Sequence, residues 1–207
     1  MKKFILIIMT LVITAGLEAQ NNLEQARQAA DTFLKSLTST VTTDNYKMFG
    51  LSSLQEVNQL QADQVFISNI IPLDRLKKYT GGDVTPLLTN VNRASCIIID
   101  RQTQQIVGIV DLERQKESYI VKGFSSSDLS AALGRINKEL FKQKFSLVRV
   151  PALNVFFGSF TDTNNQMKYV SLQNNSNLQT EIGEIRPAED FVKRLVPMAN
   201  AYNGLPW

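Results

Sequence analysis

The sequence predicts an α+β fold, with a mainly antiparallel sheet of two meander or hairpin units packed by amphipathic helices. Three observations lead to this class. Apolar residues follow helical spacing after residue 20, β-rich runs separated by short polar turns begin near residue 92, and helical spacing returns after residues 125 and 187. Strands followed by a helix occur twice, over 95–143 and 145–202, which suggests a degenerate β-β-α repeat, although the two halves share no clear residue pattern.

The first helix of the folded part is expected after residue 20. Its apolar residues recur every three or four positions and form one stripe: Leu23, Ala26, Ala30, Phe33 and Leu37. The hydroxyl-rich stretch 38–43 favours the end of this helix, because Thr and Ser side chains compete for backbone hydrogen bonds. A second, short helix is expected over 53–60, where Glu56 can form a capping box with Ser53.

Short elements are predicted before the main sheet. Residues 65–71 are typical of a strand that Pro72 ends, and residues 73–79 predict a short helix followed by a glycine pair. Residues 83–90 are expected to be irregular, since Pro86 prevents regular strand pairing.

Three β-rich runs, 95–100, 105–113 and 118–124, are separated by short polar turns. Such spacing predicts an antiparallel meander. Apolar residues occupy both faces of the run 105–113, so this strand is expected to be central in the sheet.

A longer helix is expected over 127–143, opened by the Ser125-x-x-Asp128 pattern. Its buried stripe would consist of Leu129, Leu133, Ile136 and Leu140. A strand over 145–150 and a hairpin of 153–160 with 167–172 follow. Pro187 starts the last helix, with Phe191, Leu195, Met198 and Tyr202 facing inward, and Pro197 is expected to kink or restart it.

The first 19 residues have the organisation of a secretory signal peptide. A basic start is followed by the apolar run 4–17 and by Ala19 at the expected cleavage site. The apolar run is shorter than the ~20 residues of a typical membrane-spanning helix, which disfavours the rival interpretation as a retained anchor. We therefore expect residues 1–19 to be removed and 20–207, 188 residues, to form a single exported domain in the periplasm or outside the cell.

Charge and cysteine content limit the chemistry further. Cys96 is the only cysteine, so no internal disulfide can form, and its apolar neighbours predict a buried, poorly reactive thiol. Residues 20–207 contain 20 basic and 18 acidic side chains, but the segment 114–149 has a local excess of +5. This excess either attracts an acidic partner or polymer or is a scattered set of solvated surface charges.

Histidine is absent, which removes the commonest general base and the commonest transition-metal ligand. No Ser-x-x-Lys, phosphate-binding loop or dinucleotide-binding glycine pattern is present either. We therefore expect no cofactor and no metal, and a carboxylate pair is the remaining catalytic option. The stretch 162–166 lacks the glycine and glutamate of a calcium loop and predicts an ordinary turn.

A candidate binding surface is formed by Phe156, Phe160 and Trp207, unless both faces of the strand are buried. The expected function is that of an exported, non-enzymatic binding or interaction module, of the inhibitor or envelope assembly type. Its partner would be another protein or an envelope polymer, with no nucleic acid and no membrane span after cleavage. The alternative is a carboxylate-dependent hydrolase or sugar-binding protein, which a deep cleft with two facing carboxylates would favour.

Overall fold

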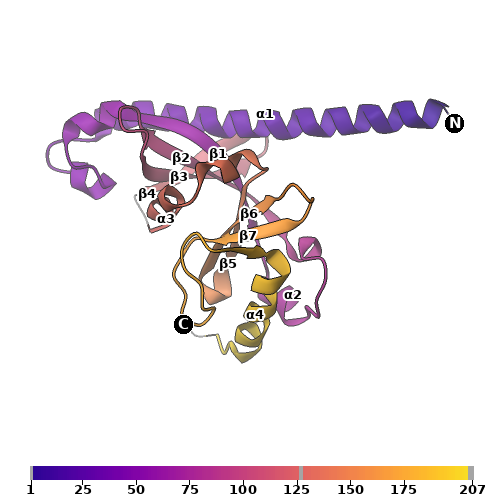
Figure 1. Cartoon of the computed structure of the whole chain (residues 1–207). Helices are drawn as coiled ribbons and strands as arrows, with labels where there is room; N and C mark the ends of the chain where they lie inside the picture. Colours follow the sequence, from indigo (N-terminus) through magenta and orange to yellow (C-terminus); the bar gives the residue numbers. More distant parts are fainter. Residues whose placement is uncertain (1, 126–127, 205–207) are drawn as a thin grey trace.

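Within the described residues, eight strands form one sheet with the order β4-β3-β2-β1-β5-β6-β7-β8 (Figure 1). The computed structural model describes residues 2–125 and 128–204, with side chains from residue 21 onward. The strands are β1 (Leu60–Ile70), β2 (Thr89–Asp100), β3 (Ile106–Gln115), β4 (Ser118–Ser125), β5 (Ser146–Val150), β6 (Val155–Thr161), β7 (Met167–Ser171) and β8 (Ile185–Pro187). All neighbouring pairs are antiparallel except β1 and β5, which confirms the predicted α+β class with a mainly antiparallel sheet.

The helices separate into four α-helices and five short 3-10 helices in the described part of the chain. The α-helices are α1 (Lys2–Thr40), α2 (Leu73–Lys77), α3 (Asp128–Arg135) and α4 (Ala188–Ala201). The 3-10 helices are η1 (Tyr46–Phe49), η2 (Leu54–Gln59), η3 (Thr85–Leu87), η4 (Lys138–Lys142) and η5 (Pro151–Leu153).

Two four-stranded meanders, β1–β4 and β5–β8, meet at their first strands, and each is followed by a helix. The strand order runs outward on both sides of the parallel β1–β5 pair. A half-turn about an axis that runs between β1 and β5, parallel to them, places the strand order of one meander on that of the other. The same half-turn exchanges the two faces of the sheet. In agreement with this relation, α3 and α4 lie on opposite faces: Val170 on β7 points to the cluster around α3, and its neighbour Tyr169 points to α4.

The strands bury apolar side chains on both faces, because strand residues alternate in direction. Cys96 and Ile98 on β2 point towards α1, whereas Ile97 and Ile99 point towards α3. The α1 stripe that covers β1–β4 consists of Ala26, Ala30, Leu34 and Leu37, and Val41 directly after the helix extends it. On the same face of the sheet, at the other end, α4 and α2 cover β5–β7.

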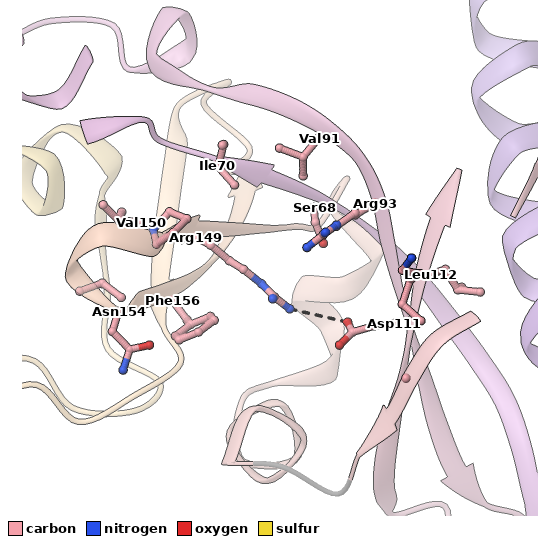
Figure 2. Close-up of a pocket in the computed structure, with 14 residues that line it drawn as sticks. Ser68, Ile70, Val91, Arg93, Asp111, Leu112, Arg149, Val150, Asn154 and Phe156 are labelled. Atoms are coloured by element: carbon pink, nitrogen blue, oxygen red, sulfur yellow. Dashed lines mark ion pairs between the residues drawn. The ribbon is translucent and has the colours of Figure 1, made fainter. Parts of the chain in front are cut away.

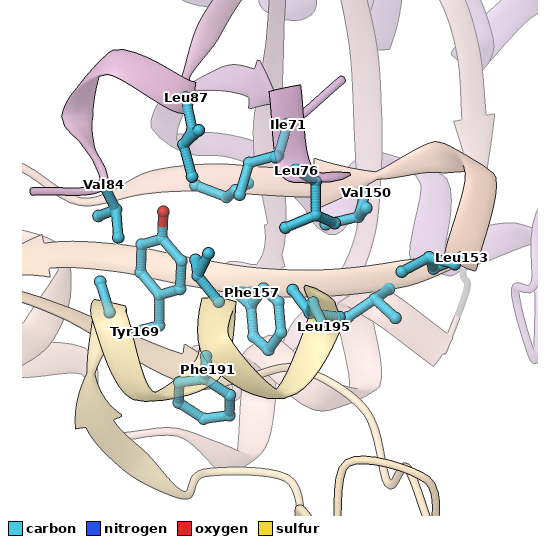
Figure 3. Close-up of a cluster of buried hydrophobic side chains, with 14 of the residues drawn as sticks. Ile71, Leu76, Val84, Leu87, Val150, Leu153, Phe157, Tyr169, Phe191 and Leu195 are labelled. Carbon is cyan, nitrogen blue, oxygen red and sulfur yellow. The ribbon is translucent and has the colours of Figure 1, made fainter. Parts of the chain in front are cut away.

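The cluster beneath α4 is centred on stacked aromatic rings (Figure 3). Phe157 on β6 and Tyr169 on β7 stack with their centroids 5.4 Å apart, and Phe191 of α4 lies 4.8 Å from Phe157. All three side chains are fully buried. The inward face predicted for the last helix is therefore correct at Phe191 and Leu195, while Met198 and Tyr202 pack at its margin.

The helix predicted over 127–143 is shorter in the structure. It ends at Arg135, and Asn137 adopts an extended backbone before η4 begins, with its side chain accepting a hydrogen bond from the Glu139 N–H. Gly134 and Asn137 are poor helix formers, and Asn is well suited to cap a new helix. The predicted stripe is nevertheless buried at Leu133, Ile136 and Leu140, with Leu129 at its edge.

Other boundaries also differ from the expectations. Strands β1 and β2 begin earlier than predicted, at Leu60 and Thr89. The added stretches lack a regular apolar alternation, and two register shifts between the strands accommodate them. The short edge strand β8 had no counterpart in the sequence pattern. The element predicted at 53–60 is the 3-10 helix η2, and α4 continues through Pro197 without restarting.

Candidate functional site

One face of the sheet changes from apolar to polar along its strands. On β3, Ile109 lies under α3, while Asp111 and Glu113 on the same face lie beyond it. On β2, Ile97 is followed towards the other end of the strand by Ser95 and Arg93. Because α3 and η4 cover only the apolar end, the polar end forms a pocket of about 420 Å³ (Figure 2).

The pocket is lined from both meanders. Its wall on one side is the tight β5–β6 connection, in which Pro151 ends β5 and Asn154 adopts a left-handed conformation, with φ 51°. This connection makes Arg149 and Phe156 direct cross-strand neighbours. The Arg149 guanidinium consequently lies 5.3 Å from the centre of the Phe156 ring, within the range of a cation–π contact.

An ion pair closes the pocket across the sheet. Arg149 Nη2 on β5 lies 3.7 Å from Asp111 Oδ1 on β3, although β2 and β1 run between these strands (Figure 2). The intervening strands present the small side chains of Ser95 and Ser68, which leave room for the arginine. Ser95 also donates a hydrogen bond of 2.9 Å to Asp111, which fixes the carboxylate that faces Arg149.

A second carboxylate, Glu113, lies between two further cations. Its Oε2 atom is 3.6 Å from Arg93 Nη2 and 3.7 Å from Lys122 Nζ. The three ion pairs of the pocket are thus longer than a hydrogen bond, whereas the pair Lys142–Glu139 on η4 is 2.7 Å long. In the described part of the chain, these ion pairs therefore leave the cations without a carboxylate at hydrogen-bond distance.

Two adjoining hollows extend the pocket at both ends. One, of about 540 Å³, shares Asp111, Arg149 and Phe156 and continues towards Leu129 of α3. The other, of about 510 Å³, shares Arg93 and continues along the sheet towards Arg114. We call these three hollows together the groove.

The electrostatics of the central pocket are positive. Arg93, Lys122 and Arg149 line it together with the carboxylate of Asp111. Arg149 carries a further unused donor, because its buried Nε–H has no acceptor in the described part of the chain. Lys122 and Arg149 belong to the basic segment 114–149, so part of its excess charge is concentrated here rather than scattered.

Two of the three residues predicted to form a binding surface, Phe156 and Phe160, are described, and they lie in different surroundings. Phe156 is half-buried and lines the groove. Phe160 is only 5% exposed, because β6 is an internal strand whose faces are both covered at that end, so it offers no binding surface. Trp207 lies outside the described residues. Of the two described residues, Phe156 alone belongs to the candidate site.

The charged residues of the groove were not recognised in the sequence. A signal was present, since Asp111 and Glu113 interrupt an otherwise apolar strand at alternate positions and must share one face. Arg93 and Arg149 could not be joined to them without the strand order. Which charges meet depends on the parallel β1–β5 pairing, and no local pattern specifies that pairing.

Three carboxylates line the groove. Asp111 and Glu113 stand next to each other on β3, and each is paired with at least one cation at 3.6–3.7 Å. Asp128, at the start of α3, lines the hollow of about 540 Å³. Among the described residues, no cluster of three or more Asp, Glu, Cys or His side chains is arranged to hold a metal ion. The stretch at 162–166 is a turn, in which Asp162 accepts hydrogen bonds from the N–H groups of Asn164 and Gln166.

Comparison with protein-family models, with curated proteins and with solved structures gives no match for this chain. In the described part of the chain, no helix is both long enough and apolar enough to cross a membrane. The groove is therefore interpreted from its own geometry and charge.

Proposed function

We propose that this chain is exported and acts as a non-enzymatic binding module that recognises an acidic segment of a partner protein in the groove. The observation that carries this proposal is the convergence of Arg93, Lys122 and Arg149 on one open pocket through ion pairs of 3.6–3.7 Å. Cations gathered in a cleft attract anionic partners and orient them during association. We propose the role of an inhibitor or an envelope assembly factor for such a module.

A protein partner is favoured over an envelope polysaccharide. Sugar-binding sites commonly stack a sugar ring on an exposed aromatic face. In the groove, Arg149 covers one face of Phe156, the aromatic ring that lines the central pocket. The remaining lining combines apolar side chains, such as Ile70 and Val91, with charged ones, and its cations suit the carboxylates of Asp and Glu.

The arrangement of carboxylates supports binding rather than hydrolysis. A carboxylate-dependent glycosidase needs two carboxyl groups on opposite sides of the scissile bond, one of them protonated. Asp111 and Glu113 are neighbours on one strand, and each forms an ion pair with an arginine, at 3.7 Å and 3.6 Å respectively. The protein should stay unlabelled by fluorophosphonate probes, and specific labelling of one serine would overturn the non-enzymatic role.

Export is proposed from the basic start, the apolar run and Ala19 of the first 19 residues. The protein recovered from its native cell should begin near Gln20. Intact mass spectrometry of the native protein tests this expectation. A mass that retains residues 1–19 would contradict the exported form.

Binding is tested with poly-L-glutamate as a model acidic partner. The purified protein should bind it with an affinity that falls steeply as salt is raised, since exposed charges are screened. Arg93→Glu should weaken binding, whereas Arg101→Glu should not, because Arg101 lies in the exposed turn at the opposite end of β2. Both variants change the net charge equally.

Two results would contradict the proposal. Equal effects of Arg93→Glu and Arg101→Glu would show that net charge, and not the groove, attracts the polymer. Tighter binding of polygalacturonate than of poly-L-glutamate would overturn the protein partner in favour of an acidic polysaccharide.

A further inference from the structure

We infer that Arg149 is the residue that binds a carboxylate of the partner, and that Asp111 is an internal substitute that holds the Arg149 guanidinium until the partner replaces it. Because this role depends on the proposed binding of an acidic segment, it deepens that function. It assigns the groove a specific recognition residue and a built-in competitor.

The first step concerns the orientation of Arg149. Its side chain crosses above β1 and β2, lies against the ring of Phe156 and ends opposite Asp111 (Figure 2). A guanidinium fixed between an aromatic ring and a carboxylate loses little conformational freedom when a ligand binds. Arg149 is only 29% exposed on its side chain, whereas Arg93 is 59% exposed. Arg149 is therefore the more pre-organised of the two.

The second step concerns the donors that remain free for a ligand. Among the described residues, Asp111 is the only ion-pair partner of Arg149, at 3.7 Å. The buried Nε–H of Arg149 has no acceptor among them. A buried donor without an acceptor is unfavourable, and a guanidinium can donate two parallel hydrogen bonds to one carboxylate. When the guanidinium leaves Asp111 and its Nε edge becomes accessible, a partner's carboxylate that accepts from Nε–H and one Nη–H satisfies both conditions.

The third step concerns Asp111. Ser95 holds its carboxylate with a 2.9 Å hydrogen bond, so Asp111 stays in place when Arg149 moves away. Its side chain is 47% exposed, and its distance to Arg149 is longer than a hydrogen bond. Asp111 therefore opposes binding weakly, by offering Arg149 an alternative carboxylate and by repelling the incoming one.

The ligand chemistry is that of a carboxylate rather than a phosphate. The groove already places two carboxylates, those of Asp111 and Glu113, against its cations at 3.6–3.7 Å. Phosphate sites in proteins commonly use the N–H groups at the start of a helix. The pocket lining comes from β1 to β6 and the β5–β6 connection, and its cationic groups are side chains.

Three variants measured by calorimetry with poly-L-glutamate test this role. Arg149→Lys keeps the charge but loses the planar fork, and it should weaken binding about tenfold, the equivalent of one charge-assisted hydrogen bond. Asp111→Asn keeps an acceptor for Ser95 but removes the competing charge, and it should strengthen binding up to about fivefold. Arg101→Lys is the matched control and should bind like the unaltered protein.

The Arg149 Nε–H signal in the NMR spectrum provides a direct readout, since it is identified by its disappearance in Arg149→Lys. We expect it to shift on addition of poly-L-glutamate. An unshifted signal, an Arg149→Lys variant that binds normally, or weaker binding by Asp111→Asn would each overturn the role of this pair. If Arg93→Glu still impairs binding in that case, the groove remains the binding site and only the assignment to Arg149 fails.

Discussion

The ring of Phe145 lies directly against Gly158 on β6, so closely that no side chain fits between them. A Cβ atom added at Gly158 would lie 2.2 Å from Cζ of Phe145 and 2.8 Å from a methyl group of Val170. Phe145 itself is held by Phe66 and Phe141, with ring centroids 4.8 Å and 5.1 Å away. The glycine therefore makes the close packing of this aromatic group possible.

Gly158→Ala should destabilise the protein by about 1–3 kcal/mol or more, because the Phe145 ring must leave its position and disturb its aromatic neighbours. Gly123→Ala on β4 is the matched control, since a Cβ there meets no atom within 4 Å. Chemical unfolding of both variants provides the measurement. Equal stability of the two would show that the cluster repacks without cost.

Leu133 anchors α3 to the sheet and is fully buried. Leu133→Ala should reduce the free energy of unfolding by about 2–5 kcal/mol, because it removes buried methyl groups and leaves a cavity. Leu129→Ala on the same helix should cost less, since Leu129 is only partly buried. An unchanged unfolding midpoint for Leu133→Ala would mean that α3 contributes little to the core.

The sequence predicts those parts of the fold in which the spacing of apolar residues determines the local structure. The alternation of Cys96, Ile97, Ile98 and Ile99 matches a strand buried on both faces, and the Leu133 stripe is correctly phased even though the helix breaks before η4. The groove could not be predicted in this way, because its residues come from distant parts of the sequence. Arg149 and Asp111 are 38 positions apart, and they meet only because β1 and β5 pair in parallel between them. Long-range strand pairing of this kind leaves no periodic signal.

Cys96 should be unreactive in the folded protein. It is fully buried on the face of β2 that α1 covers, and burial raises the pKa of its thiol to about 12. Since the thiolate is the nucleophile, a maleimide should label Cys96 only after denaturation. Met48→Cys provides a positive control in the same fold, because Met48 is 86% exposed. Rapid labelling of native Cys96 would show that α1 does not cover this face in solution.

The buried hydroxyl of Tyr169 has no hydrogen-bond partner among the described residues. The Tyr169 side chain lies in the same cluster as Val84 and Phe157 (Figure 3). Burial raises the pKa of this phenol above its ordinary value. Tyr169→Phe removes an unsatisfied polar group, so it should leave stability unchanged or raise it by up to about 1 kcal/mol.

The contrasting variant is Tyr79→Phe. The Tyr79 hydroxyl donates a 2.6 Å hydrogen bond to the carbonyl of Gly82, so this variant should lose about 0.5–1.5 kcal/mol. Thermal unfolding of both variants distinguishes the two hydroxyls. A loss of stability in Tyr169→Phe comparable to that in Tyr79→Phe would indicate that the buried hydroxyl has an acceptor in solution.

Glu189 links the start of α4 to the loop at Gly82. Its Oε1 atom accepts a 2.9 Å hydrogen bond from the Gly82 N–H and forms a 2.9 Å ion pair with Lys193. The Gly82 N–H and Lys193 hold the pKa of this carboxyl below its ordinary value of 4.5. A carboxyl group with a lower pKa in the folded state stabilises the fold above its unfolded-state pKa, and this contribution is lost as the pH falls through the folded-state value.

We therefore expect Glu189→Gln to be less stable than the unaltered protein at pH 7, with the difference shrinking as the pH falls below 4.5 and vanishing below the folded-state pKa of Glu189. Unfolding midpoints measured from pH 2 to pH 8 test this expectation. Glu117→Gln, in the exposed turn between β3 and β4, controls for the loss of one negative charge. A constant difference between Glu189→Gln and the unaltered protein over the whole pH range would show that the Glu189 carboxylate charge does not stabilise this contact.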